Sequence, residues 1–95
     1  MDNSVSSDRL TALERRRKRL RFRSWHRGTR ELDLLLGPFA DRHLAGLTDA
    51  ELAEYEALLT MPDPDVYDWI LGQAEPPPAL ARGVLGLIKQ FHKTD

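Results

Sequence analysis

Apolar residues recur along this sequence with the period of an α-helix, and polar or glycine-containing stretches separate one periodic segment from the next. One such segment has apolar residues at positions i, i+3, i+4 and i+7: Leu32, Leu35, Leu36 and Phe39. That spacing places the four side chains on one face of a helix. No segment alternates between apolar and polar residues as a half-buried strand does. The sequence therefore predicts an all-α protein, a small bundle of about five helices.

The third predicted helix has the clearest start signal. Thr48 and Glu51 have the spacing of a capping box. Leu47 and Leu52 stand at the two positions of a hydrophobic staple, which fixes the direction in which the chain enters the helix. The expected inner face of this helix consists of Leu52, Tyr55, Leu58 and Leu59.

The fourth predicted helix starts with Asp63 as its cap and Pro64 at the favoured first position, and it stops at Gly72. Trp69 is expected to lie on the side of this helix that faces the core. Three consecutive prolines at 76–78 then form a stiff connector. The last predicted helix has an apolar face made of Leu80, Val84, Leu87, Ile88 and Phe91.

The first two predicted helices have less definite bounds. Either Ser7 or Thr11 is suited to cap the first helix. Its thin apolar stripe consists of Leu10, Leu13, Leu20, Phe22 and Trp25. The second helix is expected from about residue 29 to about residue 42, with Gly37-Pro38 as an irregularity or an early end.

The stretch Arg27-Gly28-Thr29-Arg30-Glu31 at the start of the second helix is the candidate contact site. We expect Gly28 at the N-cap and Glu31 at the third helical position, where a carboxylate stabilises a helix by about 0.3–1 kcal/mol through the helix dipole. Because glycine leaves the backbone bare, a partner surface could approach closely here. Helix capping alone would explain the same residues, and on spacing alone that structural interpretation is favoured.

The small net charge of −1 conceals a strong asymmetry. Residues 9–30 are rich in arginine and contain Glu14 as their only acid, whereas residues 31–75 are rich in acids and contain Arg42 as their only base. Such an asymmetry indicates an interaction surface, or a basic helix that pairs internally with acidic ones. The Arg-rich first helix could also bind nucleic acid, which is the second hypothesis for function. The sequence pI near 6.3 argues against nucleic acid.

Composition excludes several classes of protein. A chain of 95 residues with 41% hydrophobic residues fits one small domain, expected at 8–92 between tails at 1–7, predicted to be flexible, and 93–95. The absence of cysteine excludes disulfides, thiolate metal sites and cysteine nucleophiles. The histidines are scattered, which favours no metal site. No nucleophile and base stand together, so an independent enzyme ranks third. No apolar run is long enough to span a bilayer, and we expect no membrane insertion.

The order of several motifs resembles the succinate dehydrogenase assembly factors, small proteins also called flavinators. The signature is Arg27-Gly28-x-x-Glu31 followed by Leu32-Asp33. The resemblance continues through Leu44-x-x-Leu47, the acidic helix at 51–59 and the segment Asp63-Pro64-Asp65-Val66-Tyr67-Asp68-Trp69-Ile70-x-Gly72. It covers about residues 9–92. His26 stands where many bacterial relatives carry arginine, which weakens the positive charge before Arg27.

The resemblance implies a helical chaperone that is not itself an enzyme. Such a factor binds the flavoprotein subunit of succinate dehydrogenase, or of fumarate reductase, and promotes covalent attachment of FAD to a histidine of that subunit. FAD would be handled through the partner and not bound firmly, and direct contact with FAD is left open. A monomer in the bacterial cytoplasm is expected. The implied partner-binding residues are Arg27, Gly28 and Glu31, with Arg30, Asp33 and Trp25 as additions, although Trp25 is as well suited to packing inward.

Overall fold

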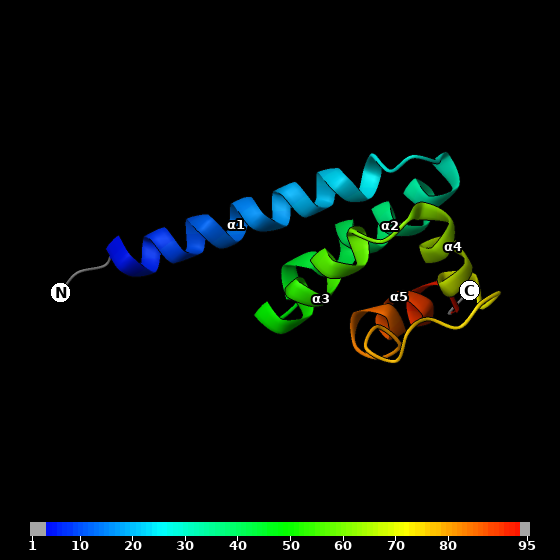
Figure 1. Ribbon diagram of the computed structural model, residues 1–95. Coiled ribbons are helices and arrows are strands. Elements are labelled where there is room, and N and C mark those ends of the chain that lie inside the picture. The colour runs from blue at the N-terminus through cyan, green and yellow to red at the C-terminus, as the bar shows by residue number, and fades with distance from the viewer. Residues whose placement is uncertain (1–3, 94–95) are drawn as a thin grey trace.

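The computed structural model describes residues 4–93 and is all-α over that range (Figure 1). Five α-helices and one short 3₁₀ helix follow one another: α1 Ser4–Trp25, α2 Arg30–His43, η1 Leu44–Gly46, α3 Asp49–Leu59, α4 Asp63–Leu71 and α5 Val84–Lys93. The predicted fold class is confirmed. Residues 1–3 and 94–95 of the two predicted tails lie outside the described part of the chain, while residues 4–7 belong to α1 and Lys93 to α5.

α1 is much longer than the bundle it belongs to. Its C-terminal part packs against α2 and α3, and its N-terminal part projects beyond the other helices (Figure 1). The molecule therefore measures 53 × 26 × 26 Å. The helix begins at Ser4, before either predicted cap, Ser7 or Thr11. Its predicted apolar stripe is only partly right: Leu20 is buried, but Leu10 and Phe22 are exposed because one lies on the projecting part and the other points away from the bundle.

The start of α2 differs from the prediction by one residue. Thr29, and not Gly28, is the N-cap, and its hydroxyl oxygen accepts a hydrogen bond from the Leu32 backbone N–H at 3.3 Å. Glu31 is consequently the second helical residue instead of the third. The reason is chemical, since the threonine side chain can accept this bond and glycine has no side chain to do so.

Gly37-Pro38 neither ends nor separates α2, which continues to His43. Pro38 has no N–H to donate to the carbonyl of Leu34, so α2 lacks one helical hydrogen bond at this point but is not interrupted. Gly37 is explained by Trp25, whose indole lies directly over it. A Cβ atom at position 37 would overlap the Trp25 ring, so glycine is needed for this close approach.

The capping box that starts α3 is confirmed. Thr48 Oγ1 accepts from the Glu51 N–H at 3.1 Å, and Glu51 Oε1 accepts from the Thr48 N–H at 2.9 Å. Leu47 and Leu52, the predicted staple, are both buried. α3 ends at Leu59, and the chain turns sharply into α4.

α4 begins one residue earlier than predicted. Pro62 is its N-cap, so Asp63 is the first helical residue and Pro64 the second. The prediction that the Asp63 carboxylate caps α4 is wrong, because that carboxylate is engaged elsewhere. The predicted end is confirmed: Gly72 adopts a left-handed φ of 75°.

α5 starts where a side chain from another helix caps it. The carboxylate of Glu54, in α3, accepts a hydrogen bond from the Val84 N–H at 3.0 Å, and Gly83 before it has a φ of 71°. Leu80 therefore precedes the helix. The buried face of α5 comprises Val84, Leu85 and Ile88, and Leu87, which was predicted to face inward, is exposed.

Tyr55 makes the fold sensitive to alkaline pH. Its side chain is completely buried, and its hydroxyl lies 2.5 Å from Ser24 Oγ. Ser24 donates its own proton to the Leu20 carbonyl at 2.7 Å, so Tyr55 is the donor in the pair.

Burial raises the pKa of Tyr55 to about 12. An unfolded tyrosine loses its proton near pH ~10. Above that pH the unfolded state is thus the first to ionise, and the stability contributed by the neutral buried phenol is lost as the pH rises to about 12.

We predict that Tyr55→Phe costs about 0.5–1.5 kcal/mol of stability at pH 7, the value of one hydrogen bond. Above pH ~10 that cost should shrink by about 1.4 kcal/mol per pH unit, because phenylalanine cannot ionise in the unfolded state. Urea titrations at pH 7, 10 and 11 measure the difference. Tyr67→Phe, at a half-buried tyrosine of α4, is the matched control. A cost for Tyr55→Phe that stays constant with pH would contradict the prediction.

Candidate functional site

The guanidinium of Arg27 ties together three parts of the chain. Arg27 lies between α1 and α2, and its Nε and Nη2 donate to Asp63 Oδ1 at 3.0 and 2.5 Å. Nη1 donates to the Leu59 carbonyl at 2.6 Å, and Nη2 also donates to the Met61 carbonyl at 3.1 Å. The Leu59 carbonyl belongs to the last residue of α3 and the Met61 carbonyl follows that helix, and carbonyls at a helix C-terminus have no partner within the helix. The side chain is only 10% exposed, so Arg27 holds the end of α3 and the start of α4 against the α1–α2 loop.

Gly28 and Asp63 complete the same arrangement. The Gly28 N–H donates to Asp63 Oδ2 at 2.6 Å, so each carboxylate oxygen of Asp63 is used. A Cβ atom at position 28 would lie 2.7 Å from Asp63 Oδ2, closer than such atoms normally approach. A side chain at position 28 would therefore force the Asp63 carboxylate to shift. We call Arg27, Gly28 and Asp63 the clasp.

Asp33, from the first turns of α2, supports the clasp from the other side. Its Oδ1 accepts a hydrogen bond from the Arg27 backbone N–H at 2.6 Å. Arg27, Gly28 and Asp33, three of the predicted partner-binding residues, thus lie together and bond to one another or to Asp63. The Arg27 guanidinium, the Gly28 N–H and the Asp33 carboxylate are all engaged in these internal bonds.

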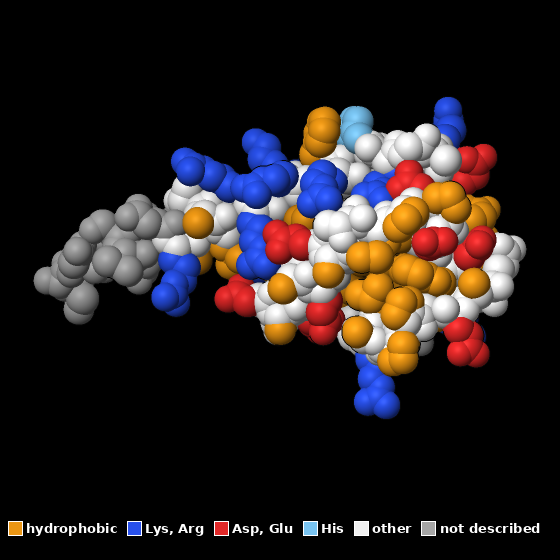
Figure 2. Space-filling view, viewed as in Figure 1, with side chains coloured by type: hydrophobic (Ala, Val, Ile, Leu, Met, Phe, Trp, Pro, Cys, Tyr) orange, Lys and Arg blue, Asp and Glu red, His pale blue; other side chains and the backbone are white. Residues whose placement is uncertain are grey.

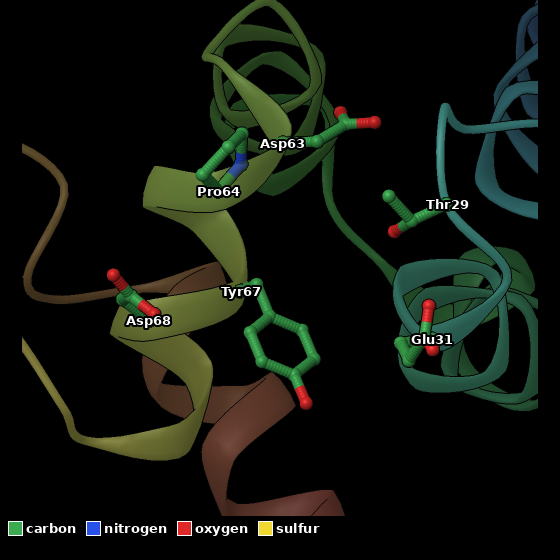
Figure 3. A pocket seen from close by; sticks show the side chains of 6 residues that line it. All are labelled: Thr29, Glu31, Asp63, Pro64, Tyr67 and Asp68. Carbon is green, nitrogen blue, oxygen red and sulfur yellow. The ribbon is translucent and has the colours of Figure 1, made fainter.

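Glu31 lies beside the clasp, at the edge of an open hollow. The hollow has a volume of about 350 Å³ and lies between the start of α2 and the first two turns of α4. It is lined by Thr29, Glu31, Asp63, Pro64, Tyr67 and Asp68. Figure 3 shows the Tyr67 ring between the two helices, with its hydroxyl toward the side of α2. Among the described residues, the carboxylates of Glu31 and Asp68 have no hydrogen-bond or ion-pair partner.

The two remaining predicted residues do not line the hollow. Arg30 is exposed at the first position of α2. Trp25 is half-buried over Gly37, and its indole N–H donates to Asp41 Oδ1 at 3.2 Å. The packing role considered for Trp25 is confirmed.

Four residues that line the hollow were not predicted as site residues from the sequence: Asp63, Pro64, Tyr67 and Asp68. Their spacing carried a signal, since residues 63, 64, 67 and 68 fall on one side of a helix that begins near 63. The interpretation of Asp63 as a helix cap concealed it. The partner of that carboxylate stands 36 residues earlier in the chain, at Arg27, and no local pattern connects the two.

Part of the charge asymmetry is internal. Arg16 of α1 forms a two-pronged ion pair with Glu56 of α3, at 2.8 and 2.9 Å. Hydrogen bonding from Arg16 lowers the pKa of Glu56. Arg17 donates to the Leu44 and Leu47 carbonyls, at 2.9 and 3.1 Å. The Arg16 and Glu56 side chains are 28% and 34% exposed, so the pair is worth no more than about 1 kcal/mol.

The described residues show neither a metal site nor a membrane span. Within 4–93 no three histidine, cysteine or acidic side chains gather so that they could hold a metal ion. No helix in the same range is long and apolar enough to cross a membrane. His26 and His43 are exposed, and His92 is half-buried, with Nε2 2.7 Å from the Leu35 carbonyl.

The chain is thus a small all-α protein in which the Arg-Gly-x-x-Glu segment is held against the Asp-Pro-Asp start of α4. The family model described as "Flavinator of succinate dehydrogenase" matches residues 18–92, and the chain belongs to this family. The predicted resemblance is thereby confirmed.

Two relatives show how far the similarity extends. The chain is 40% identical over 89 residues to succinate dehydrogenase assembly factor 2, mitochondrial, of Dictyostelium discoideum, covering 94% of this chain and 63% of that protein. It is 41% identical over 83 residues to FAD assembly factor SdhE of Acetobacter pasteurianus, covering 87% of this chain and 73% of the relative. The chain thus spans somewhat less than two thirds of the Dictyostelium protein.

Proposed function

We propose that this protein binds the flavoprotein subunit of succinate dehydrogenase and promotes the covalent attachment of FAD to it. The match to the flavinator family over residues 18–92 carries this proposal. The names of the Acetobacter and Dictyostelium relatives support it. The protein acts as a monomeric chaperone in the bacterial cytoplasm and performs no reaction of its own. Fumarate reductase is a second client to be tested in the same assay.

The contact surface in this proposal is the hollow with Glu31 at its edge. Glu31 is the one residue of the predicted signature that is exposed, charged and without an internal partner among the described residues. The clasp beneath it fixes the backbone from which the carboxylate projects. Arg27, Gly28 and Asp33 accordingly support binding by holding this geometry, and Glu31 makes the contact. FAD stays within the partner, since an open hollow on so small a chain cannot enclose a dinucleotide deeply.

A flavinylation assay tests the proposal. The flavoprotein subunit is produced in cells that lack their own flavinator, with or without this protein, and covalent flavin is detected by its fluorescence on a denaturing gel. The wild-type chain should restore the fluorescent band, and Glu31→Ala should not. Glu31→Ala should still fold, because it loses only a dipole interaction of about 0.3–1 kcal/mol.

The matched control is Glu75→Ala, which removes an exposed carboxylate from the proline-rich connector far from the signature in sequence. It should restore flavinylation fully. A wild-type chain that restores no covalent flavin would overturn the proposed function. Full restoration by Glu31→Ala would leave the function intact but would remove Glu31 from the contact surface.

A further inference from the structure

The basic residues of α1 fall into two sets. The inner set, which includes Arg16 and Arg17, is bonded to α3 and to nearby backbone carbonyls. The exposed basic residues of α1 are Arg9, Arg15, Lys18, Arg19 and Arg21, and we define the outer set as Arg15, Lys18 and Arg21. None of these three has a hydrogen bond or ion pair to the part of the chain that the structure describes. The internal pairing that accounts for the inner arginines therefore leaves the outer set unexplained.

An exposed aromatic ring lies among these cations. Phe22 is 62% exposed, and its ring is stacked on that of His26 with 3.9 Å between centroids. His26 Nδ1 lies 2.7 Å from the Phe22 carbonyl, which fixes the imidazole in place. Figure 2 shows lysine and arginine side chains along the exposed edge of α1, with a hydrophobic side chain and a histidine where the helix meets the bundle. We call Arg15, Lys18, Arg21 and Phe22 the outer face of α1.

The dimensions and chemistry of the outer face suit a protein surface. Its residues extend over eight consecutive positions of a helix, or about 10 Å from the first to the last. Arginine and aromatic residues are enriched in protein–protein interfaces, where an aromatic side chain often serves as the buried anchor. A long polyanion such as nucleic acid would extend past this short face. Residues 31–75 are rich in acids, and their charge opposes a polyanion that extends from α1 onto the rest of the bundle.

We infer that the outer face of α1 is a second docking surface for the flavoprotein, and that it meets an acidic patch with an apolar recess for Phe22. The inference rests on the proposed function. The hollow lies between α2 and α4, whereas the outer face belongs to α1, so the partner would be held at two places. Cations at the rim of an interface mainly speed association, whereas a buried aromatic anchor slows dissociation.

Binding kinetics with the purified flavoprotein subunit test the inference. The triple variant Arg15→Glu, Lys18→Glu, Arg21→Glu should slow association at least ~10-fold at low salt and remove most of its salt dependence. The control Arg42→Glu, Arg82→Glu, Lys89→Glu changes the net charge equally at exposed cations outside α1 and should change association by less than ~3-fold. Phe22→Ala should raise the dissociation rate about 10-fold.

The outcomes separate the two proposals. If the wild-type chain does not bind the flavoprotein, the proposed function fails. If it binds but the two triple variants associate equally fast, the docking surface is overturned while the proposed function stands. Helical circular dichroism spectra that match the wild type are expected, because the outer set makes no internal bonds within the described chain. An anisotropy titration with single- and double-stranded oligonucleotides should show weak binding at physiological salt. Tight, salt-dependent binding that the outer triple variant abolishes would replace the docking surface with a nucleic-acid site.

Discussion

Asp63→Ala is expected to lower the free energy of unfolding by about 2–4 kcal/mol, because it breaks a largely buried ion pair on one side only. Arg27 would keep its positive charge in a position that is 10% exposed, with bonds to two carbonyls but no carboxylate. The Gly28 N–H would lose its acceptor as well. The estimate is below that for a fully buried pair because the Asp63 side chain is 21% exposed and water can partly replace it.

Chemical denaturation of Asp63→Ala beside Asp65→Ala measures this loss. Asp65 is exposed and lies two residues further along α4. Asp65→Ala removes the same charge from the same helix terminus and should cost less than ~1 kcal/mol of stability. Gly28→Ala tests the clasp at its other residue, the one whose N–H donates to Asp63. Its Cβ would push against Asp63 Oδ2, and a smaller loss of about 1–3 kcal/mol is expected. Equal stability of the two aspartate variants would show that the clasp contributes nothing to the fold.

Trp69→Ala is expected to cost about 3–5 kcal/mol, the range for removing a large aromatic side chain from a core. Trp69 is 7% exposed in α4 and belongs to the continuous core cluster. Native domains have a stability of about 5–15 kcal/mol, so such a loss removes a large fraction of it and should lower the unfolding midpoint strongly. Trp25→Ala, at a half-buried indole, should cost distinctly less. Thermal and urea unfolding followed by circular dichroism compare the two, and a near-wild-type midpoint for Trp69→Ala would contradict the assignment of Trp69 to the core.

The sequence predicted those parts of the fold whose causes are local. The capping box of α3 and the glycine that ends α4 act within a few residues, and both were identified correctly. The predicted bounds failed where a distant group decides. Glu54 of α3 starts α5, and Trp25 of α1 accounts for Gly37. Neither contact can be predicted from the periodicity of neighbouring residues.

The candidate site divides in the same way. Glu31 was identified and does lie at an exposed hollow, although at the second helical position. The inward roles of Arg27, Gly28 and Asp33 could not be predicted, because they depend on Asp63, which is brought to them only when α4 packs beside the α1–α2 loop. Tyr67 and Asp68 enter the site for the same reason.

The clasp restricts which substitutions this part of the sequence can accept during evolution. The Arg27 guanidinium would lose its carboxylate partner if position 63 changed, and a side chain added at position 28 would push that carboxylate away from the Gly28 N–H. Lysine cannot substitute at position 27, since one ammonium cannot reproduce a planar fork that serves a carboxylate and two carbonyls at once. Selection should therefore act against single replacements at these three positions, and divergence among them requires paired changes.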